Sequence, residues 1–348
     1  MSLLATRTQN VRSKSNLDKY EIRPSRYGAL EGYVDDTNRP DSIITPELKR
    51  KAFSSIGSTL ETPVIDYDGS ITIGSSRSVT VADSELTSAM QSISFTTYVW
   101  GFTQVPSLFH NNEIEMQKDF NKKFYLYLHK FLSTLDTAAL TNLNSNKTQV
   151  WADYLSYTDP TTTSDIVKSA TANQDNFLGD INIMMEANDY FGDIRFISNG
   201  GFQSIIRAQQ EFGLYNSQKK EMQADDKTLH YSVRLTNGAG DKATGYAVQK
   251  GSLGLLTRVD REALYNRKTN LSYEWGTMKD PAFNLTLGTM FYESVGDFNA
   301  IAGAATADMT ASYKHHYGFS VDVAFVPPYA SDIANNANAI MKCAVTTA

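Results

Sequence analysis

Apolar side chains recur every three or four positions from Asn112 to Leu143, which is the spacing of one face of an α-helix. About 30 residues at about 1.5 Å each give a rod of roughly 45 Å. Asn112 with Glu115 three positions later resembles a capping box, in which Asn replaces the usual Ser or Thr. The pattern therefore predicts one long helix over 112–143 as the structural axis of the protein.

Between residues 57 and 90 the pattern changes to branched apolar residues alternating with small polar ones, which is typical of β-strands. Residues 62–67 lead into Asp68-Gly69, a two-residue hairpin signal, and 70–73 follow. A long hairpin with so little bulky apolar material is not stable by itself. We expect it to lie on another surface, either a second subunit or the rest of this chain.

The other predicted elements mix both types. Thr45-Pro46-Glu47 opens a short helix through 48–53 that displays Lys49, Arg50 and Lys51, because an N-cap residue precedes proline at the first helical position. The pattern has no internal repeat and no flexible linker, and it predicts an α+β fold. The further predicted helices are 174–190 and 202–212, and the further predicted strands are 92–102, 193–198, 229–235, 245–249, 319–325 and 339–345.

The first 26 residues are polar and basic, with almost no apolar periodicity. Such a segment is either a solvated tail or an arm that lies across a neighbouring subunit or faces a polyanion. Its acids are Asp18 and Glu21. The basic residues, which are the candidate arm contacts, are Arg7, Arg12, Lys14, Lys19, Arg23 and Arg26.

Composition narrows the class of protein. The 348 residues carry a formal net charge of -6, which argues against a general polyanion binder but leaves room for local basic patches. Cys343 is the single cysteine, so an intrachain disulfide is excluded and a reducing compartment is expected. No stretch reads as a signal peptide or a membrane span, and we expect a soluble chain.

The search for catalytic devices yields no specific candidate. Gly238–Ala243 has the letters of a dinucleotide fingerprint, but a strand follows it, which predicts a hairpin tip. Asn199–Gly201 lies between a strand and a helix and is read as a helix cap in preference to a nucleotide site. His315 and His316 point to opposite faces of a strand, and Cys343 lies in an apolar strand. We expect no catalytic, metal or cofactor site and no enzyme activity, although a cysteine–histidine pair stays open.

Taken in order, these elements resemble a tailed-bacteriophage major capsid protein with the Hong Kong 97-like fold. The shared order is a basic arm, a long two-stranded excursion, a strand, a very long helix, an α/β middle section and a returning strand. The resemblance covers about residue 45 to the end, and no single motif in it is diagnostic. The stretches that carry it are 111–114 with 119–124, 135–140, 187–192, 255–264 and 316–325.

The resemblance implies a division of the chain. It assigns an N-terminal arm to 1–52, an extended loop to 57–90, a peripheral domain to 91–160 and 313–348 with a spine helix at about 112–143, and an axial domain to 161–312. In such shells the extended loop lies over the adjacent subunit. The candidate inter-subunit residues of this loop are Val64, Ile65, Tyr67, Ile71, Ile73 and Arg77.

The resemblance also implies a function. We expect a structural protein that self-assembles into hexamers and pentamers of an icosahedral shell around double-stranded DNA, with a separate scaffolding protein and a portal as partners and the virion as its location. The loop contains no lysine, so the lysine cross-link of some family members is not expected. The alternatives are an encapsulin-like shell around cargo enzymes and an α/β nucleotide-binding enzyme that uses Asn199–Gly201.

Overall fold

The computed structural model describes most of the chain. The described residues are 7–8, 22–55, 57–65, 88–109, 112–148, 161–163, 166–171, 174–187, 190–208, 214–216, 221–224, 227–259, 273–295, 313–328 and 338–347.

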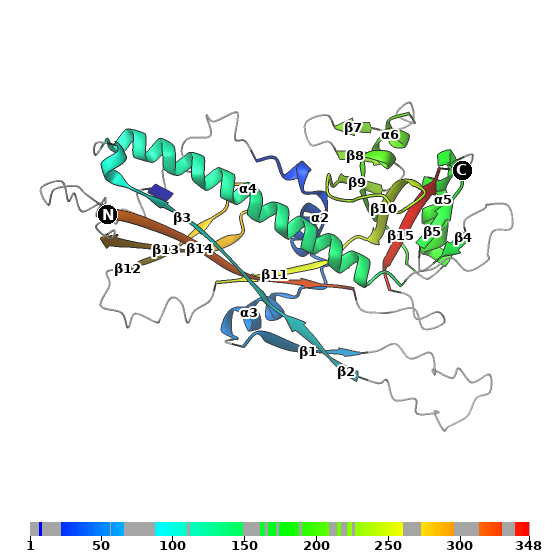
Figure 1. The fold of residues 1–348 in the computed structure, drawn as a ribbon. Helices are drawn as coiled ribbons and strands as arrows, with labels where there is room; N and C mark the ends of the chain where they lie inside the picture. Colours follow the sequence, from blue (N-terminus) through cyan, green and yellow to red (C-terminus); the bar gives the residue numbers. More distant parts are fainter. Residues whose placement is uncertain are drawn as a thin grey trace, which may run out of the picture.

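Helices and strands are interleaved along the sequence (Figure 1). The helices are η2 (Pro24–Arg26), α2 (Gly28–Thr37), α3 (Pro46–Ser54), η3 (Pro106–Phe109), α4 (Glu113–Ser145), α5 (Gln174–Ala187) and α6 (Gly200–Ala208). The strands are β1 (Thr59–Ile65), β2 (Ser88–Ser94), β3 (Thr96–Gln104), β4 (Thr161–Thr163), β5 (Ile166–Ser169), β6 (Ile194–Ser198), β7 (Leu214–Asn216), β8 (Glu221–Ala224), β9 (Lys227–Tyr231), β10 (Asp241–Gln249), β11 (Gly254–Arg258), β12 (Tyr273–Lys279), β13 (Thr286–Val295), β14 (Tyr313–Val326) and β15 (Ile340–Thr346).

The predicted long helix is confirmed as α4. Asn112 is its N-cap, and the Asn112 side-chain oxygen accepts hydrogen bonds from the backbone N–H groups of Ile114 (3.1 Å) and Glu115 (3.3 Å). Its 33 residues span about 50 Å. The apolar stripe is buried in the largest core cluster, where Phe120 and Phe124 pack against Tyr317 and Phe319 of β14.

A five-stranded antiparallel sheet lies beneath α4, built around β14. One edge of β14 pairs with β13 and then β11, and the other edge pairs with β3. Successive strand residues point to opposite faces of a sheet. Val323 therefore packs with α4, whereas Ala324 and Val326 pack with α3, the start of β1 and the end of β2.

The second sheet has eight strands in the order β4-β5-β15-β10-β6-β9-β8-β7. Two of its pairs are parallel, β15 with β5 and β6 with β9. α5 and α6 contribute Phe177 and Phe202 to a separate core cluster with strand residues such as Phe196. Residues 340–346 thus pair within the eight-stranded sheet, whereas the expected domain division groups them with 313–326.

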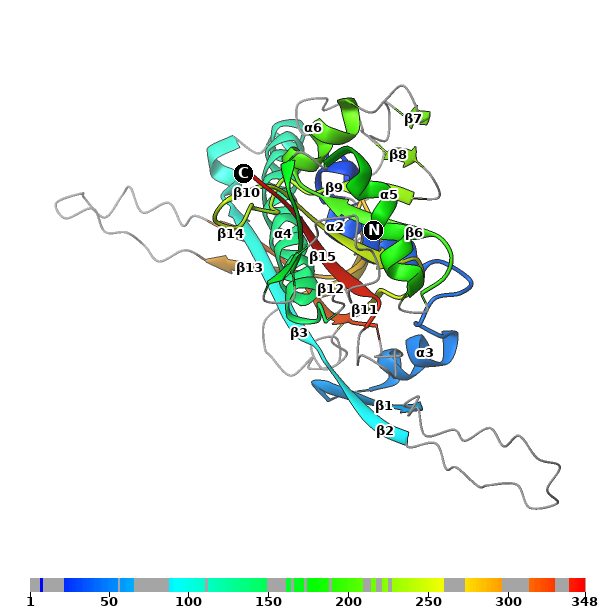
Figure 2. The same ribbon diagram turned by 90° about the vertical axis from the view of Figure 1, so that its right-hand side faces the viewer.

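β1 and β2 form a two-stranded antiparallel sheet that projects from the body of the molecule (Figures 1 and 2). The sequence predicts one strand over 92–102, but the chain leaves strand geometry at Phe95. β2 before this break pairs with β1, and β3 after it pairs with β14. The predicted turn at Asp68-Gly69 and the strand at 70–73 lie outside the described residues.

Several predicted bounds shift by a few residues. The helix expected over 46–53 is confirmed as α3, whose N-cap Thr45 accepts a hydrogen bond from Leu48 N at 3.2 Å. The helix expected over 202–212 begins earlier, at Gly200, and the strand expected over 319–325 begins at Tyr313. β12 and β13 come from residues for which the sequence pattern predicts no strand.

α2 is the largest difference from the sequence-based expectation. Residues 28–37 fall in the predicted N-terminal arm, yet Tyr27, Leu30 and Tyr33 are fully buried in the main core. Figure 1 shows α2 between α4 and the two sheets. This stretch is therefore part of the body of the protein, because its aromatic and aliphatic side chains fill the space between α4 and the sheets. No helix in the described part of the chain is long and apolar enough to cross a membrane.

Candidate functional site: the base of the extended strand pair and the helix α2 network

Among the side chains that the structure describes, those of the β1–β2 pair that are buried against the rest of the chain lie near its base. Leu60 and Ile93, which are directly opposite each other across the two strands, are buried against α3, β11 and β14. Met90, three residues farther out on β2, is 61% exposed. Among the side chains of the pair that the structure describes, the buried apolar ones are therefore Leu60 and Ile93.

A buried ion pair lies at this base. Arg258 of β11 is 3.1 Å (Nε) from Oδ2 of Asp322 on β14, and the two side chains are 8% and 7% exposed. Thr97 donates its hydroxyl to the other oxygen of Asp322 at 2.7 Å. Since Thr97 belongs to β3, the ion pair connects three adjacent strands of the five-stranded sheet.

Arg258 also holds the two chain segments that lead into the pair. Its Nη1 donates to the carbonyl oxygen of Ser55 at 3.0 Å, where α3 ends. Its guanidinium lies 4.2 Å from the ring centroid of Phe95, where β2 ends. Phe95 N in turn donates to Ser58 O at 2.8 Å. We call Arg258, Asp322, Thr97, Phe95 and Ser55 the clamp, because these contacts fix where β1 begins and where β2 ends.

A second polar network ties the start of α2 to α4 and β9. Oδ1 of Asp136 accepts hydrogen bonds from the backbone N–H groups of Ala29 and Leu30, both at 3.0 Å. Oδ2 accepts from the hydroxyl of Ser232 at 2.8 Å. A carboxylate of α4 therefore caps the N-terminus of another helix, where negative charge is stabilising. Burial raises the pKa of Asp136, against the lowering effect of its hydrogen bond to Leu30 N.

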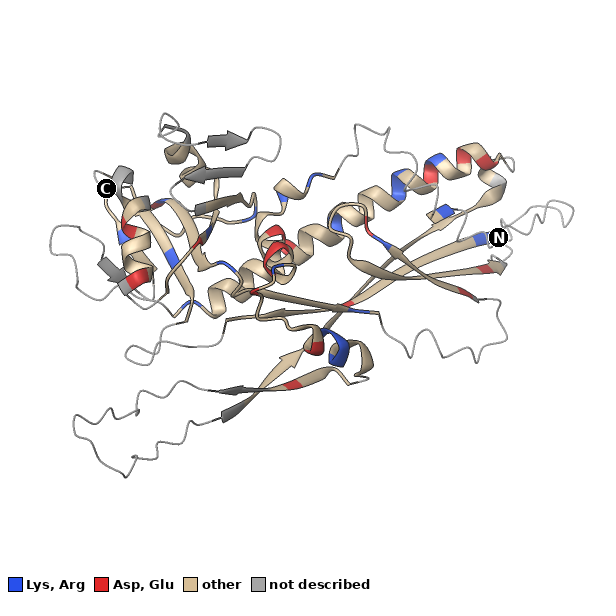
Figure 3. Cartoon of the chain, turned by 180° about the vertical axis from the view of Figure 1, so that it is seen from behind, with Lys and Arg blue, Asp and Glu red and all other residues tan. Residues whose placement is uncertain are grey.

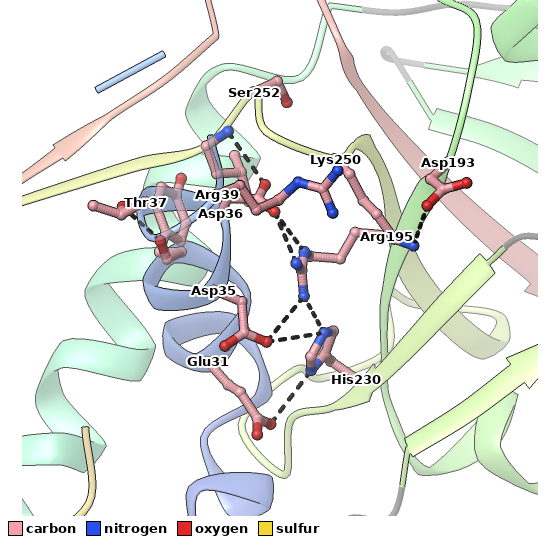
Figure 4. A network of polar contacts seen from close by, with 12 residues as sticks. Glu31, Asp35, Asp36, Thr37, Arg39, Asp193, Arg195, His230, Lys250 and Ser252 are labelled. Carbon is pink, nitrogen blue, oxygen red and sulfur yellow. Dashed lines mark hydrogen bonds and ion pairs between the residues drawn. The ribbon is translucent and has the colours of Figure 1, made fainter. Parts of the chain in front are cut away.

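The end of α2 is tied to the eight-stranded sheet by charge (Figure 4). Nε and Nη2 of Arg195 donate to Oδ1 of Asp36 at 3.0 and 2.8 Å, and Asp36 is fully buried. Burial raises the pKa of Asp36, against the lowering effect of the Arg195 charge. Around this pair, His230 contacts Arg195 and lies 3.3 Å (Nδ1) from Oε2 of Glu31. α2 thus connects α4 to both sheets.

Of the six predicted arm residues, the three that the structure describes differ in burial, and the other three lie outside the described residues. Arg7 is 2% exposed, and its Nη2 lies 2.8 Å from Oε2 of Glu113 at the start of α4. The Arg7 guanidinium is thus paired within the chain, and its assignment as a contact to a neighbouring subunit or DNA stays a prediction. Arg23 and Arg26 are exposed. Arg12, Lys14 and Lys19 lie outside the described residues.

The predicted loop residues are only partly described. Val64 and Ile65 lie in β1, opposite Ala89 and Ser88 of β2. The other four residues, Tyr67, Ile71, Ile73 and Arg77, lie outside the described residues. Their assignment to an inter-subunit surface stays a prediction.

The two glycine-containing turns, at 199–201 and 238–241, connect elements of the fold. The side-chain oxygen of Asn199 accepts from Gly201 N (3.0 Å), Phe202 N (3.3 Å) and Thr244 N (3.2 Å). It is the cap of α6, as predicted. The turn at 238–241 leads into β10, but it is not a hairpin tip, because β6 lies between β9 and β10.

The remaining chemical candidates are separated in space. His316 contacts Ser294 and Thr103, whereas Nε2 of His315 lies 3.3 Å from Oε1 of Glu293. Cys343 is fully buried, and burial raises its pKa. Among the described residues, no three of His, Cys, Asp and Glu form a group that could hold a metal ion.

The sequence reasoning missed the clamp and the α2 network. Arg258 within an apolar strand and Asp322 within an alternating one were available signals, since charges at such positions are rarely buried unless paired. The Asp136 cap gave no local signal, because its partners are about 106 residues away in the sequence.

No protein-family model matches the chain, and no curated protein matches it. The chain is similar to solved bacteriophage structures. A structure of Mycobacterium phage Bobi has a TM-score of 0.44 at 12% identity and covers 86% of this chain and 90% of that chain. The mature capsid of bacteriophage PhiM1 has a TM-score of 0.45 at 10% identity, with 84% and 83% covered. The capsid of the cyanophage P-SCSP1u has a TM-score of 0.44 at 10% identity, with 84% of each chain covered. With TM-scores below 0.5, these likenesses carry no argument about what this chain does.

Proposed function

We propose that this chain is a structural subunit of a closed protein shell, the major capsid protein of a tailed bacteriophage with the Hong Kong 97-like fold. The observation that carries the proposal is the β1–β2 pair, which projects from the body and whose buried apolar side chains, among those that the structure describes, lie at its base (Figure 2).

The physical reason is the stability of such a pair. An isolated two-stranded hairpin is marginally stable at best in water, and it becomes stable when it packs against other structure. In this chain Leu60 and Ile93 are buried at the base, while Met90 is exposed farther out. A neighbouring copy of the chain supplies the missing surface in this proposal. The absence of lysine between residues 57 and 90 favours a noncovalent contact.

The proposed organisation follows the element order. Residues 57–90 serve as the extended loop, α4 with the five-stranded sheet forms the peripheral domain, and the eight-stranded sheet with α5 and α6 forms the axial domain. The membership of β15 in the eight-stranded sheet favours placing 340–346 with the axial domain. The first residues of the chain serve as the arm, up to the point where η2 and α2 begin.

In this proposal the subunits form hexamers and pentamers of an icosahedral shell around double-stranded DNA. The shell assembles in the host cytoplasm with a separate scaffolding protein and a portal, and the protein ends in the virion. Its role is structural. In the Asn199–Gly201 turn that the enzyme alternative uses, the backbone N–H groups of Gly201 and Phe202 already donate to the Asn199 side chain, which caps α6.

Electron microscopy of the expressed chain with its scaffolding protein tests the proposal. The expected result is rings, tubes or closed shells. A stable monodisperse monomer under all assembly conditions would contradict it. Nucleic acid in particles purified from infected cells separates a genome-containing capsid from an encapsulin-like shell, which is expected to hold cargo enzymes.

A further inference from the structure

The surface of α4 has an uneven charge distribution. Its acids are Glu113, Glu115 and Asp119 in the first two turns, and Asp136. Asp136 is fully buried, so the exposed surface of α4 carries no acid after Asp119. The exposed lysines of the helix are Lys118, Lys122 and Lys130.

Most of the acids near these lysines already have cationic partners. Glu113 is paired with Arg7, and Asp119 is paired with Lys123 at 2.9 Å. The three lysines cover 12 residues of helix, or about 18 Å. Figure 3 shows the blue residues of α4 following the red ones of its first turns.

A second group of cations adjoins the middle of α4. Nη2 of Arg234 donates to the hydroxyl of Ser133 at 2.5 Å, and its Nη1 donates to the backbone oxygen of Arg26 at 3.4 Å. The Tyr27 hydroxyl lies 2.5 Å from Nδ1 of His129. Burial lowers the pKa of His129, and the positive charges of Arg234 and Arg26 lower it further. The exposed Arg26 therefore lies in the same positive region as the lysines. We call Lys118, Lys122, Lys130 and Arg26 the basic strip.

The opposite side of the five-stranded sheet also carries cations: Lys49 and Lys51 of α3 donate to backbone oxygens, and Arg50 of α3 is exposed. Lys49 Nζ donates to Thr37 O at 3.0 Å, and Lys51 Nζ donates to Glu61 O at 2.5 Å. α3 packs on the face of the sheet opposite to α4.

We propose that the basic strip binds the phosphate backbone of double-stranded DNA without sequence preference. The inference rests on the proposed capsid function. It assigns the solvent-exposed surface of α4 to the inner, DNA-facing side of the shell. DNA carries one negative charge per about 1.7 Å of axis, so cations spread over about 18 Å of helix length can meet several phosphates. Leu126 and Tyr127 are also exposed beside the strip, and a protein neighbour is the alternative that the experiment separates.

The test uses the unassembled full-length chain and a 30-base-pair duplex of arbitrary sequence. Fluorescence anisotropy gives Kd over a series of salt concentrations. The test variant is Lys118→Gln/Lys122→Gln/Lys130→Gln. The matched control is Arg50→Gln/Lys242→Gln/Lys279→Gln, which removes the same charge from exposed positions elsewhere.

We expect wild type and control to bind with a steep salt dependence. The strip variant should lose about tenfold or more in affinity at low salt, and its log K against log salt slope should fall by about 2 to 3, since each phosphate contact contributes about 0.9. Arg26→Gln alone should reduce the slope by about 1. Bound DNA should also raise the pKa of His129, measured by NMR and assigned with His129→Gln, because phosphates stabilise the imidazolium.

Equal losses in the strip variant and the control, or no DNA binding by wild type, would overturn the inference. So would a strip variant that keeps its DNA affinity but no longer forms shells, because that result assigns the strip to a protein neighbour. Electron microscopy of the same proteins reports on the shell separately. If shells form while the strip makes no difference to DNA binding, the inference fails and the proposed function stands.

Discussion

The clamp makes a quantitative prediction about the base of the β1–β2 pair. In Arg258→Met, Asp322 loses its ion pair while staying in a site where its side chain is 7% exposed. Removing one partner of a buried ion pair costs about 3–5 kcal/mol, because the other charge is left without compensation. Asp322→Asn leaves the Arg258 guanidinium in the same situation, and its expected cost is of the same size.

The double variant Arg258→Met/Asp322→Asn should cost much less than the sum of the two single variants, because neither charge is left alone. We expect a coupling free energy of about 2–3 kcal/mol in a double-mutant cycle, which is the upper range for residues in one network. Urea unfolding of the unassembled chain gives the four free energies of unfolding. The exposed pair Arg39–Asp41, 35% and 55% exposed, is the matched control, with an expected coupling below about 1 kcal/mol.

Additive costs for Arg258 and Asp322, within about 0.5 kcal/mol, would refute the reasoning. A local measurement adds to the test. The Phe95 amide donates to Ser58 O at 2.8 Å, and its hydrogen exchange reports on the base of the pair. Arg258→Met should speed the exchange of the Phe95 amide relative to wild type. It should speed the exchange of the β13 amides, which lie outside the clamp, much less.

Three further predictions follow from local geometry. Asn199→Ala should lower the free energy of unfolding by about 1–2 kcal/mol, because α6 loses its cap. Asn199→Asp should retain most of the wild-type stability, and equal losses of melting temperature in the two variants would contradict the capping role. Gly28→Ala should destabilise the protein more than an exposed Gly179→Ala, because a Cβ at residue 28 meets the backbone of Tyr231 whereas residue 179 has open space; similar melting temperatures for the two variants would contradict this. The lowered pKa of His129 means that the unfolded chain binds more protons than the folded chain just below pH 6.5, so this group's contribution to stability is present above pH 6.5 and is lost as the pH falls through the folded pKa. The stability of wild type relative to His129→Gln should therefore decrease on acidification, and a pH-independent difference in urea unfolding would contradict the assignment.

The elements that the sequence predicts well are those with local signals. The α4 stripe repeats over 33 residues, and both its cap residue Asn112 and the cap of α3, Thr45, occur directly before the helix that each serves. The strand at 319–325 alternates because one face packs on α4 and the other on α3. In these cases the physical cause of the structure is contained within a few neighbouring residues.

The missed elements depend on partners distant in sequence. α2 has no local N-cap signal, since its cap is Asp136. Its last turn contains Asp36, whose burial depends on Arg195. The β12–β13 hairpin did offer a signal. Asp280 accepts hydrogen bonds from Ala282 N and Leu285 N, and an Asp-Pro pair at 280–281 is typical of turns. The clamp could be suspected from Arg258 and Asp322 separately, but their pairing is decided by strand order.

The position of β15 has a consequence for biosynthesis. Residues 340–346 form an interior strand, placed between β5 and β10, which precede it by about 100 residues or more. Until the ribosome has delivered this segment, β4 and β5 are separated from the other five strands of their sheet. Non-local pairing of this kind is slow to form. Nascent chains therefore lack the complete eight-stranded sheet until residues 340–346 have emerged, so growing neighbours cannot associate through that complete sheet before then.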